Sequence, residues 1–209
     1  MPKNCPSCGS PYISGFRAGT QQIEREVHRL FPQARVRRMD YDTTRTRESY
    51  EQILSAFGNG QADILVGTQM IVKGHDFPDV TLVGIVAADI SLYASDYRAA
   101  ERTFQLLTQA VGRAGRGSKV GEAVIQTYMP EHYSIQTAAK QDYDAFYEQE
   151  ILYRELMGYP PVDEMLGIYL SGKDLEKLES CAEQLAEWIR NAHVEGLCLI
   201  GPADAALAR

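Results

Sequence analysis

Two arginines lie three residues apart at the end of a predicted helix, in the sequence Gln109-Ala110-Val111-Gly112-Arg113-Ala114-Gly115-Arg116. Side chains at this spacing share one side of a helix, and the glycines let the backbone approach a bound group closely. A guanidinium group can stabilise the phosphate charge that develops during phosphoryl transfer. Arg113 and Arg116 are therefore candidate catalytic residues. The simpler alternative is two exposed arginines beside a glycine-rich helix end.

A second motif follows a predicted strand over residues 63–67. It reads Gly67-Thr68-Gln69-Met70-Ile71-Val72-Lys73-Gly74-His75-Asp76-Phe77. In open α/β sheets, ligands bind at the carboxyl ends of the strands. Thr68 is expected at such an edge, where its hydroxyl and the nearby amides can hold a nucleic-acid phosphate. Asp76, which follows the flexible Gly74, can accept hydrogen bonds from a sugar or position the arginines.

The elements that must position these motifs alternate between strands and helices. Apolar patterns predict strands over residues 35–40, 63–67, 81–88 and 122–128. They predict helices over residues 21–31, 46–57 and 98–114. The nearly continuous apolar run at residues 82–88 is typical of a parallel strand that is covered on both faces. This alternation predicts an α/β fold with a parallel sheet and flanking helices.

The last quarter of the sequence follows a different pattern. We expect a helix over residues 142–157, which the sequence Gly158-Tyr159-Pro160-Pro161 ends. Beyond this boundary we expect a strand over residues 164–171, an amphipathic helix over residues 174–193 and a strand over residues 196–200. A unit of this size buries little apolar surface by itself. We therefore interpret it as a small truncated α+β domain, or as one that leans on a neighbour.

Composition excludes several classes of protein. The chain has 209 residues, 44% apolar and 23% charged, with a net charge of −7. These ordinary values exclude disordered, collagen-like and coiled-coil chains. The longest apolar stretch is too short to span a membrane, and the N-terminus lacks the apolar core of a secretory signal. Four cysteines are too few for a disulfide scaffold, so we expect a reduced, cytoplasmic protein. Because arginines are clustered in the sequence, the net negative charge does not exclude a polyanionic partner.

With both motifs in view, the sequence resembles the second RecA-like lobe of superfamily 2 helicases, and most closely that of the primosomal replication-restart helicases. The segment at residues 67–83 resembles motif V and the arginine segment resembles motif VI. Other segments of the family pattern are also present: residues 19–24 (motif IV), 42–44, 96–102 and 121–127. The resemblance spans nearly the whole chain. It implies a remnant of a zinc-binding insertion at residues 1–15, the lobe at 16–157 and part of a C-terminal domain at 158–209.

The resemblance also implies a role for individual residues. The contacts with nucleic acid would come from Gly19, Thr20, Thr68, Gln69, Lys73 and His75. The contacts with the nucleotide would come from Gly74, Asp76, Gln109 and Gly112. Arg113 and Arg116 would close on the ATP phosphates, with Arg116 the first candidate for the arginine finger.

Cys5 and Cys8 form a Cys-x-x-Cys pair, which is half of a four-thiolate zinc site. The resemblance implies that they are the last pair of a zinc-binding insertion. A redox pair is the alternative, but the pair precedes any βα unit. Because the other half is absent, we expect this chain to bind zinc weakly or not at all, and the intact protein to bind zinc.

The sequence contains no Gly-x-x-x-x-Gly-Lys-Ser/Thr phosphate loop and no acidic pair after an apolar strand that could hold Mg²⁺. In a helicase, one lobe supplies these groups and the other supplies the arginines. We therefore expect ATP and Mg²⁺ to act in the intact protein, and this chain alone to lack ATPase activity.

By resemblance, the intact protein is an ATP-dependent DNA helicase that moves 3′ to 5′ and restarts stalled replication forks. The implied partners are single-stranded and forked DNA, restart-primosome proteins and single-strand-binding protein, without a membrane, in the bacterial cytoplasm at the nucleoid. One alternative is a non-catalytic nucleic-acid-binding α/β module in which the arginines only grip phosphate. Another is a nucleotide-binding enzyme with a complete site, which requires a Gly-Lys motif that this sequence lacks.

Overall fold

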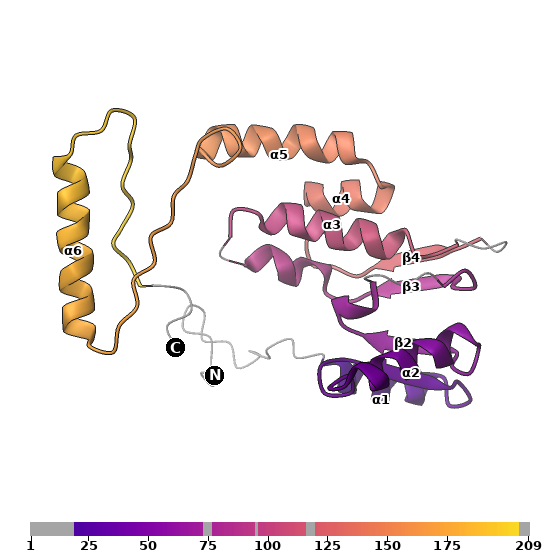
Figure 1. Ribbon diagram of the computed structural model, residues 1–209. Coiled ribbons are helices and arrows are strands. Elements are labelled where there is room, and N and C mark those ends of the chain that lie inside the picture. The colour runs from indigo at the N-terminus through magenta and orange to yellow at the C-terminus, as the bar shows by residue number, and fades with distance from the viewer. Residues whose placement is uncertain (1–18, 73–76, 95, 116–119, 205–209) are drawn as a thin grey trace, which may run out of the picture.

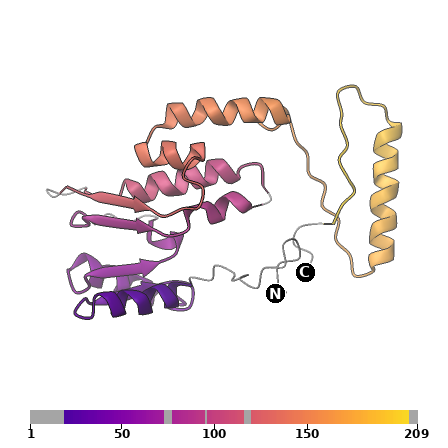
Figure 2. The same ribbon diagram turned by 180° about the vertical axis from the view of Figure 1, so that it is seen from behind.

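The computed structural model describes residues 19–72, 77–94, 96–115 and 120–204. Its strands are β1 (Val36–Met39), β2 (Ile64–Gly67), β3 (Leu82–Ile85) and β4 (Glu122–Ile125). β1 pairs in parallel with β2, and β3 pairs in parallel with β4. Figures 1 and 2 show that all of these strands point in the same direction. The predicted parallel α/β fold is confirmed, although the described strands form two separate pairs.

Helices cover the two strand pairs. In chain order they are α1 (Thr20–Leu30), α2 (Arg47–Gly58), η1 (Gln69–Val72), η2 (Ala88–Tyr93), α3 (Ala99–Val111), α4 (Tyr133–Lys140) and α5 (Tyr143–Met157), where η marks a 3₁₀ helix. α1 and α2 pack against β1, whereas α3 packs against β3 and β4. α4 and α5 are layered outward from α3 (Figure 1). Both 3₁₀ helices contact α3 as well.

Side chains at the ends of the helices explain where the helices begin and end. The Thr46 side chain accepts a hydrogen bond from the backbone N–H of Ser49 at the start of α2. Asp142 caps α5 in the same way through the N–H of Ala145. Gly158 ends α5 with φ of 62°, a left-handed conformation that glycine adopts without strain.

The main core lies between η2, α3, α4 and α5. Its buried members are Ala88, Phe104, Leu107, Ile135, Ala138 and Phe146. The Phe104 and Phe146 rings stack with their centroids 4.1 Å apart. Because the last turn of α3 carries the start of the arginine motif, this core determines where the motif lies.

Asp89 is a buried carboxylate that joins η2 to the segment after β4. It is 3% exposed, and it accepts hydrogen bonds from the Thr127 hydroxyl at 2.8 Å and from the Tyr128 N–H at 3.0 Å. Burial alone would raise the pKa of Asp89, but these hydrogen bonds outweigh it and hold the pKa below its ordinary value. Its ionised form therefore stabilises the fold.

We expect Asp89→Ala to lower the free energy of unfolding by about 1–3 kcal/mol, because two part-buried donors lose their acceptor. Urea denaturation of the chain measures this change, with the exposed Asp42→Ala as the control. In the unsubstituted chain, the contribution of Asp89 is fully present above the unfolded-state pKa of about 4. It is lost as the pH falls through the lower native pKa. Equal stability of the two variants at neutral pH would contradict the prediction.

The C-terminal part differs from its prediction. α6 (Leu175–Asn191) forms as expected and stands apart from the α/β layers (Figure 1). The described chain has no paired strand at residues 164–171 or 196–200, where strands were predicted. Leu166, Tyr169 and Ile200 in these segments are about nine-tenths exposed. The physical reason is that an extended segment needs a partner strand to satisfy its backbone groups and cover its apolar side chains.

Among the described residues, the helices are too short or too polar to cross a membrane.

Candidate functional site

The C-terminal end of α3 carries the arginine motif in a close-packed turn. Gln109 lies exposed on the last turn of α3, and Arg113 is half-buried just beyond it. Gly115 has φ of 72°, and its N–H donates to the Val80 carbonyl at 2.9 Å, which ties the motif to the chain immediately before β3. A Cβ at Gly121 would collide with the backbone of Ala114 and Gly115. The glycines thus allow this turn to fold against its neighbours.

Thr68 and Gln69 lie exposed where β2 passes into η1. The Thr68 carbonyl accepts a hydrogen bond from the Ile71 N–H at 3.2 Å, which begins the 3₁₀ turn. A side chain at Gly67 would collide with the Met39 carbonyl and the Ile71 side chain, so glycine is required there. The Thr68 hydroxyl is therefore presented to solvent at the carboxyl end of β2, as the sequence predicted.

Gly19 and Thr20 begin α1, which has no acidic residue in its first turn. The Thr20 hydroxyl donates to Asp40 at 2.5 Å, and Asp40 directly follows β1. This hydrogen bond commits the hydroxyl proton of Thr20, so a phosphate at this position would be bound by backbone N–H groups of the helix start. The sequence did not indicate this role of Asp40.

Asp40 is held by a dense set of donors. The Arg38 guanidinium lies 2.7 Å from its carboxylate, and the Thr43 N–H donates to it at 3.0 Å. Burial alone would raise the pKa of Asp40, but the hydrogen bonds from Thr20 and Thr43 and the charge of Arg38 outweigh it. Its pKa therefore lies below the ordinary value. The start of α1 is thus fixed at the carboxyl end of β1.

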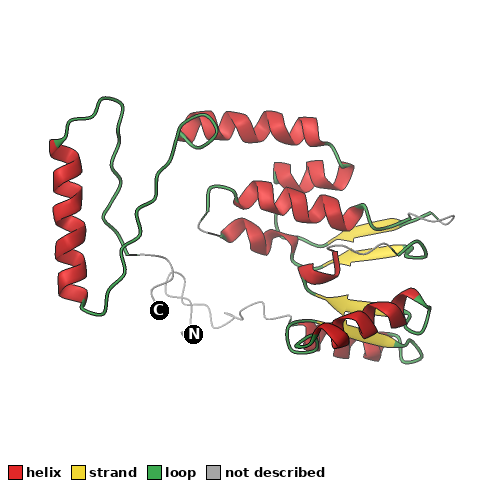
Figure 3. Cartoon of the chain, in the orientation of Figure 1, coloured by secondary structure: helices red, strands yellow, loops and turns green. Residues whose placement is uncertain are grey.

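The structure places the two groups of predicted site residues at opposite edges of the strands. Thr20 and Thr68 lie at the carboxyl ends of β1 and β2. Arg113 lies beside the amino end of β3, because the Gly115 N–H donates to the carbonyl of Val80, two residues before this strand. The common direction of the strands is visible in Figure 3. η1, at the carboxyl end of β2, also contacts α3, the helix whose last turn carries the start of the arginine motif. This separation was not visible in the sequence.

Several predicted site residues lie outside the described residues. These are Cys5, Cys8, Lys73, Gly74, His75, Asp76 and Arg116. Their roles stay predictions.

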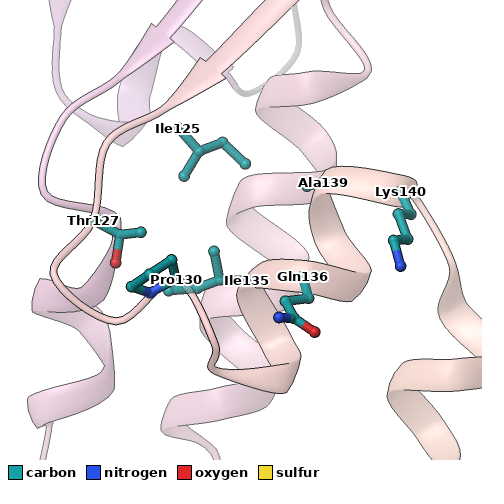
Figure 4. A pocket seen from close by; sticks show the side chains of 7 residues that line it. All are labelled: Ile125, Thr127, Pro130, Ile135, Gln136, Ala139 and Lys140. Atoms are coloured by element: carbon teal, nitrogen blue, oxygen red, sulfur yellow. The ribbon is translucent and has the colours of Figure 1, made fainter.

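A pocket at the side of β4 and α4 is a different feature of the surface (Figure 4). Its wall includes Ile125, Pro130, Ile135 and Ala139, and its charged member is Lys140. A single ammonium beside an apolar wall offers too little charge for a triphosphate. This pocket is therefore not the nucleotide site that the arginines predict.

Arg154 is the centre of a buried polar network that sequence analysis missed. Its side chain is 9% exposed and donates to Glu150 at 2.8 Å, to Glu101 at 2.9 Å and to the Pro160 carbonyl at 2.7 Å. The Tyr133 hydroxyl also donates to Glu150, at 2.6 Å. The network thus joins α3, α4, α5 and the turn after α5.

The charges of this network support one another. Burial alone would lower the pKa of Arg154, but its hydrogen bonds with Glu150 and Glu101 outweigh it and raise that pKa. Burial, together with the hydrogen bond to Glu150, raises the pKa of Tyr133. Arg154 is therefore charged and Tyr133 neutral at neutral pH.

The described residues contain no group of three or more His, Cys, Asp or Glu side chains that could hold a metal ion. The zinc prediction concerns Cys5 and Cys8, which lie outside them.

Comparison with known proteins identifies the family. Residues 13–118, about half of the chain, match the helicase conserved C-terminal domain. The chain belongs to this helicase family. It is 46% identical over 209 residues to the replication restart protein PriA of Bacillus subtilis, which covers all of this chain and 26% of that relative. Two further PriA proteins match all of the chain: that of Synechocystis at 42% identity and that of Haemophilus influenzae at 37%, over 25% and 29% of their lengths.

Family membership confirms the resemblance to a helicase lobe with a RecA-like α/β fold. The chain spans about a quarter of the length of these curated relatives. The activity of the whole protein is therefore a matter for proposal.

Proposed function

We propose that this chain is the second motor lobe of an ATP-dependent DNA helicase that moves 3′ to 5′ and restarts stalled replication forks. The observation that carries the proposal is that the arginine motif and the predicted DNA contacts lie at opposite edges of the strands, while η1 contacts α3. A motor needs this separation, because ATP and DNA bind at different places and must still influence each other. The PriA relatives support the choice of replication restart.

At the edge of the strands that carries the arginine motif, this chain would contribute positive charge to the nucleotide site. Arg113 and Arg116 would approach the γ-phosphate when the two lobes close, and Gln109 and Gly112 would line the same surface. Gly74 and Asp76 would contact the nucleotide from motif V. Mg²⁺ neutralises phosphate charge in such reactions. This sequence contains no phosphate loop, and in this proposal the phosphate loop and the metal ligands come from other polypeptide of the intact protein.

At the carboxyl ends of β1 and β2, which we call the DNA edge, Thr68 and Gln69 would hold the backbone of one DNA strand, together with Lys73 and His75. The start of α1 at Gly19 and Thr20 would bind a second phosphate. Closure and opening of the nucleotide cleft would then move this grip along the strand through η1.

The remaining assignments complete the proposal. We place the zinc-insertion remnant at residues 1–15, the lobe at 16–157 and part of a C-terminal domain at 158–209. Cys5 and Cys8 would hold zinc together with cysteines of the intact protein. The partners would be single-stranded and forked DNA, restart-primosome proteins and single-strand-binding protein, in the bacterial cytoplasm at the nucleoid.

A comparison of the 209-residue chain with the intact protein tests the proposal. Phosphate release from ATP is measured with and without single-stranded DNA. We expect no turnover by the chain alone, and turnover by the intact protein that rises with DNA. Turnover by the pure chain that Arg116→Ala abolishes would contradict the proposal.

A nucleic-acid-binding module without catalysis is the second candidate. It is favoured by the absence of a phosphate loop from this sequence. In that case, substitution of the arginines in the intact protein would weaken nucleic-acid binding and leave ATP turnover unchanged.

A further inference from the structure

Two exposed tyrosines lie beyond the carboxyl ends of β3 and β4. Tyr93 ends η2, the helix that follows β3, and is 71% exposed. Tyr128 follows β4 and is 72% exposed. A third tyrosine, Tyr41, follows β1 and is 82% exposed. Each ring thus lies at the same edge of the strands as Thr68.

Both rings are displayed from fixed backbone. The Tyr93 hydroxyl lies 3.5 Å from the Met129 sulfur, so the two segments are neighbours. Buried Asp89 accepts a hydrogen bond from the Tyr128 N–H at 3.0 Å, and the Ser91 hydroxyl lies 2.7 Å from that of Thr103 in α3. Because the backbone beneath the rings is already ordered, a planar ligand can bind to them with little further loss of entropy.

Arginines accompany these tyrosines. Arg98 and Arg102 lie at the start of α3, beside η2, with side chains 48% and 50% exposed. Both pair with Asp96, at 3.3 Å and 2.6 Å. Ion pairs this exposed contribute little free energy, so the guanidiniums can exchange the carboxylate for a phosphate.

We propose that Tyr93 and Tyr128 form a platform on which the bases of single-stranded DNA stack, while Arg98 and Arg102 bind the adjoining phosphates. Aromatic rings beside a positively charged track are how proteins hold single strands, whereas the bases of a duplex have no free face. This inference rests on the proposed function, because it extends the DNA edge from Thr68 to β3 and β4.

The test separates stacking from phosphate binding. Binding of the 209-residue chain to a labelled oligothymidylate is compared with its binding to an oligomer with the same backbone and abasic sites throughout. We expect Tyr93→Ala and Tyr128→Ala to weaken binding to oligothymidylate about 5- to 100-fold each. Binding to the abasic oligomer should stay within about twofold. Tyr93→Phe and Tyr128→Phe keep the ring and should bind as the unsubstituted chain does.

Tyr169→Ala is the matched control, because Tyr169 is 88% exposed and lies in the C-terminal part. The proposal is overturned if the alanine variants weaken binding to both oligomers equally, if they change neither, or if the chain binds neither oligomer. It is also overturned if they change only the association with another protein. DNA-dependent ATP turnover of the intact protein is a separate readout. If turnover is present but the tighter binding of oligothymidylate than of the abasic oligomer does not depend on the tyrosines, only this inference fails. If turnover is absent but this difference between the two oligomers does depend on the tyrosines, only the motor function fails.

Discussion

Arg113→Ala or Arg116→Ala in the intact helicase lowers the rate of DNA-stimulated ATP hydrolysis by about 10³- to 10⁵-fold for the residue that acts as the arginine finger. The guanidinium acts on charge that is present only in the transition state, so its loss should reduce kcat much more than the binding of ATP. Steady-state phosphate release at saturating DNA measures kcat and KM. Lysine at the same position should restore little, because it lacks the planar donor set.

Arg29→Ala is the control for this prediction. Arg29 lies on α1 with its side chain 69% exposed and pairs only with Glu26 of the same helix among the described ion pairs. The turnover of this variant should stay within about twofold of the unsubstituted protein. Unchanged turnover in both motif variants, accompanied by weaker DNA binding, would favour the nucleic-acid-binding module.

Arg154→Met should lower the free energy of unfolding of the chain by about 3–5 kcal/mol. The substitution keeps an apolar stem of similar length and leaves Glu150, whose side chain is 6% exposed, without its counter-charge. The Tyr133 hydroxyl still donates to Glu150, but it carries no charge. Urea denaturation measures the loss, with Arg29→Met as a matched exposed control that should change stability by less than about 0.5 kcal/mol.

A double variant tests whether the loss of stability comes from the unpaired charge of Glu150. Glu150→Leu combined with Arg154→Met removes both charges and should recover most of the lost stability, because an apolar pair of similar volume can replace a buried ion pair. If Arg154→Met costs less than about 1 kcal/mol, or if the double variant is no more stable than the single one, the network does not hold these helices together.

The sequence predicted most of the elements, because their signals are local. The apolar periodicity of α1, α2, α3, α5 and α6 lies within each segment. Side chains of Thr46, Asp142 and Asp174 also cap the starts of α2, α5 and α6. The predicted strand at residues 81–88 is shorter in the structure, where β3 ends at Ile85. Ala87 adopts φ of 53° and the chain turns into η2. A continuous apolar run cannot distinguish a strand from the turn that follows it.

Long-range features were not accessible from the sequence. Glu101 and Arg154 meet from different helices, and no spacing rule connects them. The sequence also did not show which aromatic residues of α5 face the core: Tyr143 and Tyr147 are 62% and 51% exposed, whereas Phe146 is buried. The site shows the same limit. The motifs gave the residue types, whereas their division between two edges follows from how β1, β3 and α3 pack.

The most direct test of the central claim uses an analogue of the transition state. The intact protein with Arg113→Ala, with Arg116→Ala or without substitution is titrated with ADP and aluminium fluoride, and separately with a non-hydrolysable ATP analogue, at saturating DNA. If these guanidiniums complete the catalytic pocket, the finger variant loses most of its affinity for the ADP–aluminium fluoride complex and keeps its affinity for the ATP analogue within a few-fold. Equal affinities of all three proteins for the ADP–aluminium fluoride complex would contradict the account.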